Sequence, residues 1–246
     1  MNYYNSIIES INYDKEICLP SNIDLVISGG GLGCYYNLIV IIILYKLVKL
    51  KKLNIRYIYS VSAGSILSVI LLCMIYNENF ILDADKLREQ YDLLKVYTND
   101  NKNNTLLDNM ELLLRSILPS NAHEICSSRL YITVNKVSVF GIYRENISTF
   151  HTFDDLMNII RCSSSVPFCS INGLFTKYKD AYYFDGILPL YKKNEYSILY
   201  IEYLIMFYKH LFKPNDDNID KLIENGYNEF MEFLYNNKKS KRFYLL

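Results

Sequence analysis

The sequence lacks an excess of charge of either sign, because 26 Lys and Arg residues balance 26 Asp and Glu residues. This balance gives no global attraction to nucleic acid or to anionic membranes. No nucleic-acid partner is therefore expected, and any attraction to a membrane must be local. The six cysteines form no C-x-x-C pair. Their spacing fits neither a zinc site nor a disulfide framework, so it favours buried, reduced thiols in an intracellular, cytoplasmic setting.

Long hydrophobic runs are also missing. Met1–Cys18 has acidic and polar residues and no apolar central region, so it does not have the pattern of a signal peptide. The longest apolar runs, Leu38–Tyr45 and Val69–Tyr76, are shorter than the roughly 20 residues that span a bilayer. Both are expected to be buried core helices. Ala is scarce while Ile, Asn, Tyr and Lys are abundant, a bias typical of AT-rich genomes such as viral or protozoan ones.

The N-terminal half of the chain has a β-α-β-α order. Asp24–Ser28 is a short apolar run that ends in glycines, as buried parallel strands do, and a long apolar helix follows from Cys34 to about Leu50. Arg56–Val61 predicts a second strand, and Ala63–Tyr76 predicts a second buried helix. This order implies a parallel sheet with right-handed crossovers. With no internal repeat and no linker, we expect one domain over residues 1–246.

Further elements are predicted along the rest of the chain, and Ile198–Phe207 is an apolar and aromatic stretch. Helices are expected at Asp83–Tyr97, Leu106–Leu118, Phe153–Arg161 and Ile219–Tyr235, and strands at Leu130–Val134, Val139–Tyr143 and Ala181–Phe184.

The first motif is a run of glycines between a strand and a helix. Glycine lets the backbone approach a ligand closely, and the free N–H groups at a helix N-terminus attract anions. A dinucleotide fingerprint would pair Gly29 and Gly31 with a third glycine at position 34, which is Cys34. An oxyanion hole is the other functional interpretation, and tight packing of the helix on the sheet is the structural one.

The second motif is Ser60-Val61-Ser62-Ala63-Gly64, which joins a predicted strand to a predicted helix. This is the setting of a nucleophile elbow, G-x-S-x-G, with Ser60 in place of the first glycine. Ser62 as a simple helix N-cap is the alternative interpretation. Adjacent parallel strands would bring this turn and the glycine loop to one edge of the sheet, where ligands bind in open α/β folds.

A serine nucleophile needs a base. The order Ser62, Asp185, His210 would match a triad, although His210 lies in an aromatic and basic stretch rather than in a sharp turn after a strand. Asp185-Gly186 does follow a predicted strand directly.

Together these segments resemble the patatin-like phospholipases. That family combines a glycine-rich loop, a G-x-S-x-G serine and a D-G-G or D-G-A aspartate, which correspond here to Ser28–Gly33, Ser60–Gly64 and Asp185–Ile187. Cys162–Pro167 (C-S-S-S-V-P) is similar to the A-S-S-A-I-P segment that precedes the family's aspartate. The resemblance extends over about residues 24 to 189.

The resemblance implies a three-layer α/β fold, with a mostly parallel central sheet and helices on both faces. It also implies lipid acyl ester hydrolysis of the phospholipase A or lipase type by a Ser62–Asp185 dyad, without a metal or other cofactor, on phospholipids or neutral glycerolipids. The oxyanion would be held by backbone N–H groups of the glycine loop, with small residues supporting the turns. The loop residues are Gly29, Gly30, Gly31, Leu32 and Gly33, and the supporting residues are Ser60, Gly64 and Gly186.

The sequence departs from the family pattern at several positions. Gly33 stands where the family has Arg or Lys, Cys34 replaces a glycine, and Ile187 is bulkier than the family's Gly or Ala. Loss of the basic residue removes positive charge near the site. A catalytically impaired, lipid-binding protein is therefore the main alternative function, and a Ser62–Asp185–His210 esterase is another.

A lipid hydrolase must also reach an interface, so peripheral membrane contact is expected. The candidate segments are Leu174-Phe175, the aromatic stretch Tyr200–Phe212 and the basic, aromatic tail Lys238–Tyr244.

Overall fold

The computed structural model describes residues 11, 15–82, 105–193, 195–202, 219–236, 240 and 242–246. Within them the strands form one eight-stranded sheet, in the order β5-β6-β3-β2-β1-β7-β8 with β4 also paired to β3. The strands are β1 (Asn22–Ile27), β2 (Asn54–Val61), β3 (Leu130–Ser138), β4 (Gly141–Ile147), β5 (Thr176–Tyr178), β6 (Ala181–Asp185), β7 (Ser197–Ile201) and β8 (Phe243–Leu245).

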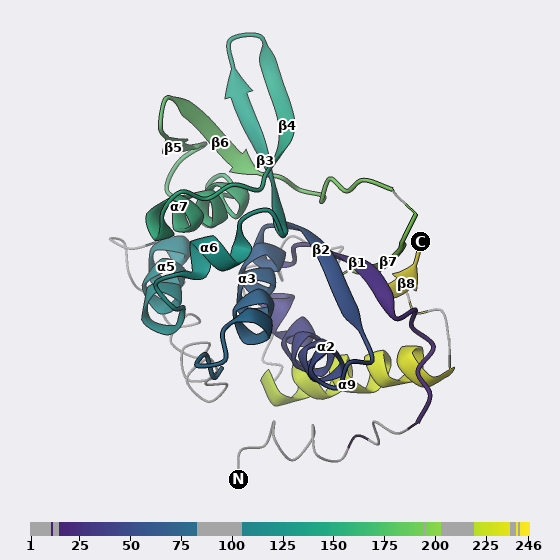
Figure 1. The fold of residues 1–246 in the computed structure, drawn as a ribbon. Coiled ribbons are helices and arrows are strands. Elements are labelled where there is room, and N and C mark those ends of the chain that lie inside the picture. The colour runs from purple at the N-terminus through teal and green to yellow at the C-terminus, as the bar shows by residue number, and fades with distance from the viewer. Residues whose placement is uncertain are drawn as a thin grey trace.

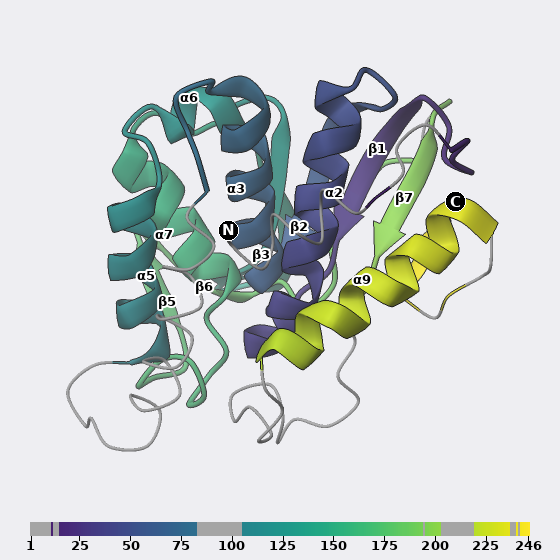
Figure 2. The same cartoon turned by 90° about the horizontal axis from the view of Figure 1, so that it is seen from below.

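The centre of the sheet is parallel and its margins are antiparallel. β7, β1, β2 and β3 pair in parallel, while β4, β6 and β8 join as antiparallel strands. Helices flank this sheet (Figures 1 and 2). The predicted α/β class with a mostly parallel central sheet is thus confirmed. The helices are the 3-10 helix η1 (Gly31–Asn37), α2 (Leu38–Lys49), α3 (Ala63–Tyr76), α5 (Leu106–Ile117), α6 (Ala122–Cys126), α7 (Phe153–Ser163) and α9 (Ile219–Asn236).

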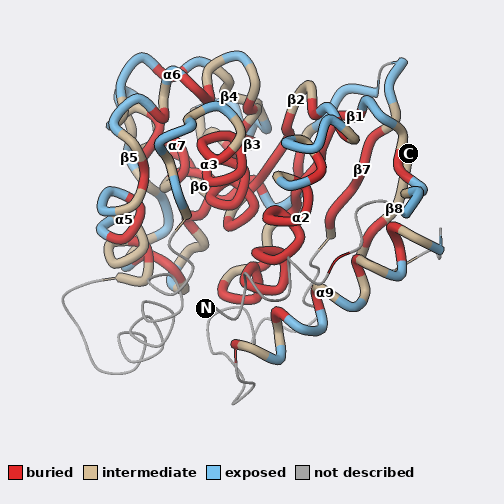
Figure 3. The backbone as a smooth tube through the Cα atoms, turned by 60° about the horizontal axis from the view of Figure 1, so that its bottom comes forward, coloured by how far each residue is buried: buried red, intermediate tan, exposed pale blue. Residues whose placement is uncertain are grey.

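The core divides according to the two faces of the sheet. Alternate residues of β1, namely Ile23, Leu25 and Ile27, join the main cluster, to which all the described helices contribute. Val26 points the other way, into a second cluster made by tyrosines and an isoleucine of neighbouring strands. Figure 3 shows that burial is highest along the central strands and along α2 and α3. The continuous apolar runs of the sequence therefore correspond to elements buried on more than one side.

Most predicted elements agree with the structure, with shifted ends. The predicted helix from Cys34 begins earlier, as the 3-10 helix η1, and continues as α2. The prediction for Val139–Tyr143 was wrong in part, because Val139 and Phe140 form the turn between β3 and β4. Sequence reasoning missed the strands β5, β7 and β8 and the short helix α6. The predicted helix Asp83–Tyr97 lies outside the described residues.

One helical stretch is longer than its apolar run suggests. Gly31–Lys49 is long and apolar enough to cross a membrane by length and composition. Most of it is nevertheless buried inside the fold, between α3 and α9. It therefore packs as a core helix, as predicted for Leu38–Tyr45.

Three described residues of two segments predicted to contact membrane, Tyr200, Phe243 and Tyr244, pack within the fold instead. Phe243, in the tail, is fully buried in β8, where its ring packs against Phe230. Tyr244 stacks on Tyr200, which is itself buried. These rings were misassigned because a terminal strand joins them to the sheet, a long-range pairing that local composition does not encode. Residues 203–218, 237–239 and 241 lie outside the described residues.

Candidate active site

Ser62 lies in a strained turn between β2 and α3. Its backbone has φ 54° and ψ −135°, a conformation that non-glycine residues rarely adopt. Two residues later, Gly64 passes so close to β1 that a Cβ atom would lie 2.5 Å from the carbonyl oxygens of Ile27 and Ser28. The glycine therefore permits α3 to begin against the end of β1. This is the sharp strand-to-helix turn that the S-x-S-x-G pattern predicts.

The glycine loop lies directly beside this turn. A Cβ atom added to Gly29 would lie 2.8 Å from the Cβ atom of Ser62. Gly30 and Gly31 have φ values of 157° and 54°, so the loop uses conformations that favour glycine. Gly31 opens η1, and the first N–H groups of a helix have no partner within it. The loop thus presents backbone donors next to the Ser62 hydroxyl.

Gly33, the last residue of the predicted oxyanion loop, has its N–H in a hydrogen bond within the loop. The N–H of Gly33 donates to the carbonyl oxygen of Gly30 at 3.1 Å, as part of the first turn of η1. The loop therefore winds into a helix sooner than the sequence suggested, and the Gly33 N–H is already used within its first turn. The N–H groups of Gly30, Gly31 and Leu32 precede this first bonded turn.

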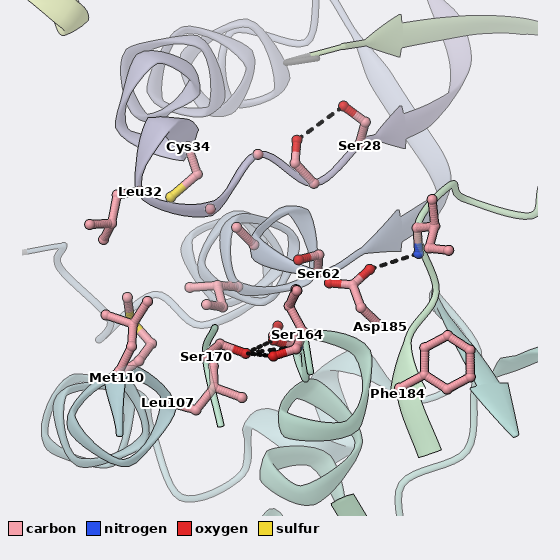
Figure 4. A pocket seen from close by; sticks show the side chains of 18 of the residues that line it. Ser28, Leu32, Cys34, Ser62, Leu107, Met110, Ser164, Ser170, Phe184 and Asp185 are labelled. Carbon is pink, nitrogen blue, oxygen red and sulfur yellow. Dashed lines mark hydrogen bonds between the residues drawn. The ribbon is translucent and has the colours of Figure 1, made fainter. Parts of the chain in front are cut away.

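Asp185 lies beside Ser62 because the strands that lead to these two residues, β6 and β2, both pair with β3. β2 pairs with β3 as far as Val61 opposite Thr133. Val134, the next residue of β3, pairs with Asp185 of β6. The two strands therefore end at neighbouring positions of β3, and their terminal side chains face each other. Figure 4 shows Ser62 and Asp185 pointing toward one another.

The carboxyl group of Asp185 is buried and held by several contacts. It accepts a hydrogen bond from the N–H of Ile187 at 2.7 Å, and the Ser62 side chain points toward it. Burial raises the pKa of Asp185 to about 6, and the neighbouring Ser62 hydroxyl and the N–H of Ile187 oppose that rise. The side-chain amide of Asn135 donates to the Asp185 carbonyl oxygen at 2.7 Å. A carboxyl with this pKa is suited to act as a general base near neutral pH.

The segment Cys162–Pro167, noted for its small residues, supports the turn from below. The Oγ of Ser163 accepts the N–H of Ser62 at 2.8 Å and donates to the carbonyl oxygen of Thr133 at 2.7 Å. The carbonyl oxygen of Ser165 accepts the N–H of Asp185 at 3.0 Å. This one segment therefore contacts the backbones of both Ser62 and Asp185. Ser60, buried beneath the turn, donates to Ser65 at 3.4 Å.

The strand end after Asp185 is held by contacts that sequence reasoning missed. Gly186 lies against β3, where a Cβ atom would be 2.6 Å from the carbonyl oxygen of Thr133. The hydroxyl of Thr133 accepts the N–H of Leu190 at 2.8 Å, and the amide of Asn146 donates to the Leu190 carbonyl oxygen at 2.8 Å. No local signal marked these partners, because they come from strands distant in sequence.

Ser62 and Asp185 lie at a cavity of about 620 Å³ (Figure 4). Most of its lining is apolar, and none of the described lining residues is basic. No described element therefore supplies a cation in place of the Arg or Lys that the family has at the position of Gly33. The side chains around the cavity include Leu32, Cys34, Ala63, Ile66, Leu106, Leu107, Met110, Val166, Pro167, Phe184, Ile187 and Leu188.

Polar groups in the cavity are few. The hydroxyl oxygen of Ser164 is buried and has no hydrogen-bond partner among the described residues, so it remains available to a ligand. Burial raises the pKa of the Cys34 thiol to about 12, which makes it an inert lining group. All six cysteines are free, and four of them are buried. Within the described residues there is no cluster of three His, Cys, Asp or Glu side chains that could hold a metal ion.

Histidine is not part of the described lining. His123 and His151 belong to other parts of the molecule, on α6 and before α7, and neither borders the cavity. His210, the base of the alternative triad, lies outside the described residues. Among the described residues, Asp185 is therefore the candidate base that lies beside Ser62.

Comparison with known proteins adds one finding. A family model described as Patatin-like phospholipase matches residues 25–188, more than half of the chain. Comparisons with curated proteins and with solved structures gave no match. The matched range begins in β1 and ends just after Asp185, so it includes the glycine loop, the serine turn and the aspartate.

Proposed function

The chain belongs to the patatin-like phospholipase family, and we propose that it hydrolyses acyl esters of lipids with Ser62 as nucleophile and Asp185 as base. The observation that carries this proposal is that Ser62 and the buried Asp185 carboxyl point toward one another in the lining of an apolar cavity. A nucleophile with a base in hydrogen-bond reach is the minimal machinery of acyl transfer.

In the first half of the reaction, the Ser62 Oγ attacks the ester carbonyl carbon while its proton passes to Asp185. The carbonyl oxygen gains negative charge, which the N–H groups of Gly30, Gly31 and Leu32 stabilise at the start of η1. Collapse of the tetrahedral intermediate breaks the bond to the alcohol. The departing alkoxide takes the proton from Asp185 and leaves an acyl ester on Ser62.

In the second half, a water molecule attacks the acyl-enzyme and gives its proton to Asp185. The bond to Ser62 then breaks, and the serine oxygen recovers that proton, which releases a fatty acid and restores the free enzyme. Asp185 therefore alternates between base and acid in both halves. Its pKa of about 6 favours both roles, because neither protonation state is strongly disfavoured near neutral pH.

The lining indicates which part of a lipid is recognised. An apolar cavity of about 620 Å³ suits a hydrocarbon chain, whose burial contributes about 0.8 kcal/mol per CH₂ group. A basic side chain that would hold a phosphate is missing from the described lining. We therefore propose that the acyl chain, rather than the head group, dominates binding of phospholipids and neutral glycerolipids.

The absence of a basic side chain from the described lining also supports a second candidate function, a catalytically impaired protein that binds lipid without turnover. A fluorophosphonate probe, which labels activated serines, separates the two candidates. We expect labelling of the wild-type protein and none of Ser62→Ala, with hydrolysis of glycerolipids that disappears in the same variant. A folded wild-type protein that binds lipid vesicles yet resists the probe would instead identify the lipid-binding function.

The His210 triad is tested with a single substitution. If Asp185 alone is the base, His210→Ala should retain the labelling and turnover of the wild-type protein. Loss of both in a folded His210→Ala protein would assign the base to a triad.

A further inference from the structure

The hairpin of β3 and β4 extends beyond the rest of the sheet (Figure 1). Four apolar side chains at its end, which we call the hairpin tip, are exposed to solvent. The exposed fractions are 93% for Val139, 88% for Phe140, 60% for Ile142 and 51% for Tyr143. Single exposed apolar residues are common on soluble proteins. A contiguous group at the end of a projecting hairpin marks a contact surface instead.

The hairpin is an ordered structure up to its turn. β3 and β4 pair without interruption from Ile132 opposite Ile147 to Ser138 opposite Gly141. Within the turn, the N–H of Phe140 donates to the Oγ of Ser138 at 3.1 Å. The apolar side chains are therefore held away from the core by regular pairing, since burying them would break the ladder.

The hairpin tip extends from the edge of the sheet that carries the candidate active site. β3 meets Asp185 at Val134, and Val139 lies five residues further along the same strand. At about 3.3 Å per residue, the tip stands roughly 17 Å beyond the aspartate. Two cavity residues at this end of the fold, Ile187 and Leu188, are also exposed.

Within β3 and β4, the charges nearest to the hairpin tip are positive, and the acidic Glu145 follows next along β4. Lys136 pairs with Tyr143 across the ladder, and Arg144 pairs with Asn135, so both cations lie just behind the apolar side chains. The segment from Lys136 to Arg144 contains no acidic residue. Apolar side chains in front of basic ones match a lipid surface, in which acyl chains lie beneath phosphate groups.

We propose that the hairpin tip inserts into the surface of a phospholipid bilayer and holds the protein there with the active-site edge toward the lipid. Val139, Phe140 and Ile142 enter the acyl region, and Lys136 and Arg144 contact the phosphates. The inference rests on the proposed function for its purpose, delivery of lipid to the cavity, but surface binding itself does not require Ser62 to react.

The first experiment uses the lack of tryptophan in the chain. Phe140→Trp, made together with Ser62→Ala so that no product alters the lipid, places a single fluorophore in the hairpin tip. We expect a blue shift of its emission on mixing with vesicles of phosphatidylcholine and phosphatidylserine, and a smaller shift with phosphatidylcholine alone. Quenching by lipids brominated in the acyl chain should accompany the shift.

Ile81→Trp in the same background is the matched control. Ile81 is 86% exposed and lies beyond the far end of α3, which starts at the serine turn. Since α3 has fourteen residues at about 1.5 Å each, it carries the chain roughly 20 Å from that edge. The emission of a tryptophan at position 81 should therefore not change when the protein binds vesicles. A shift at position 81 without one at position 140 would overturn the proposal.

The second experiment measures affinity and turnover separately. Val139→Ser with Phe140→Ser should weaken vesicle binding, measured by sedimentation, about tenfold or more, because both apolar side chains no longer gain from burial among the acyl chains. A tenfold loss corresponds to about 1.4 kcal/mol. Ile81→Ser, the matched control, should leave vesicle binding unchanged. In proteins with Ser62 intact, the double variant should hydrolyse a soluble short-chain ester normally and vesicle lipid more slowly.

Three results would overturn the inference independently of catalysis. They are absence of vesicle binding by the Ser62→Ala protein, equal binding by the double variant, and a blue shift that depends on protein concentration without lipid. The last would assign the tip to contact between two copies through the free edge of β4. Failure of hydrolysis alone would count against the proposed function and leave the binding result intact.

Discussion

Ser62 and Asp185 point toward one another because the strands that lead to them end at consecutive residues of β3. The parallel strand β2 stops opposite Thr133, and the antiparallel strand β6 arrives opposite Val134. A change of strand direction along one edge of β3 thus places Ser62 and Asp185 side by side. Both are supported by the segment after α7, through Ser163 and Ser165.

The pH dependence of turnover should report the state of Asp185. The carboxyl must be ionised to accept the Ser62 proton, and its pKa is about 6. We therefore expect kcat/KM for a soluble ester to rise about tenfold per pH unit below pH 6 and to level off above it. A rise centred near the ordinary Asp value of 3.8 would contradict the role of burial at this site.

Asp185→Asn should remove activity and yet stabilise the fold at alkaline pH. Because the folded state raises the pKa, it binds the proton more tightly than the unfolded chain does. The stability associated with this group is therefore highest below pH 3.8 and falls as the pH rises to about 6. Asn lacks the ionised form, so we expect roughly 1–3 kcal/mol more stability than wild type at pH 8.

Urea unfolding at pH 8 and at pH 5 checks this expectation. The advantage of Asp185→Asn should shrink at the lower pH, where the wild-type carboxyl is largely protonated. A variant that is less stable than wild type at pH 8 would mean that the amide fails to replace the hydrogen bonds of the carboxylate.

Gly29→Ala should damage the active site more than the fold. The new methyl group would lie 2.8 Å from the Cβ atom of Ser62, so the nucleophile must move. Because a misplacement of about 1 Å is enough to cost 100-fold in rate, we expect kcat to fall by about that factor. Gly173→Ala is the matched control, since a Cβ atom there meets no other atom within 4 Å. Equal activity of both variants would show that the loop tolerates the displacement.

Ser163→Ala tests the support beneath the serine turn. The substitution leaves the N–H of Ser62 and the carbonyl oxygen of Thr133 without their buried partner. We expect a loss of about 1–3 kcal/mol in unfolding free energy. Probe labelling of Ser62 should slow as well, because the turn is strained and relaxes without this contact. Ser116→Ala, which removes only a bond within α5 to Leu113, should change neither quantity appreciably. Normal labelling of Ser163→Ala would reduce Ser163 to a purely structural role.

The sequence by itself determined the order of the central elements and the candidate reactive positions. Gly64 and the glycines after β1 are local requirements, because a close approach of backbones excludes larger side chains whatever the rest of the chain does. Alternating and continuous apolar runs likewise specify β1, β2, α2 and α3. Four short motifs in the right order were therefore enough to identify the family before any coordinates.

Only the tertiary structure decided how those motifs meet and what surrounds them. The approach of Asp185 to Ser62, and the support from Ser163, Thr133 and Asn146, depend on pairings between strands far apart in sequence. The exposure of Val139 and Phe140 was equally invisible, since both residues have high strand propensity and only the length of the hairpin sets them beyond the core. Local propensity depends on neighbouring residues, whereas burial, pKa and the shape of a cavity depend on long-range packing.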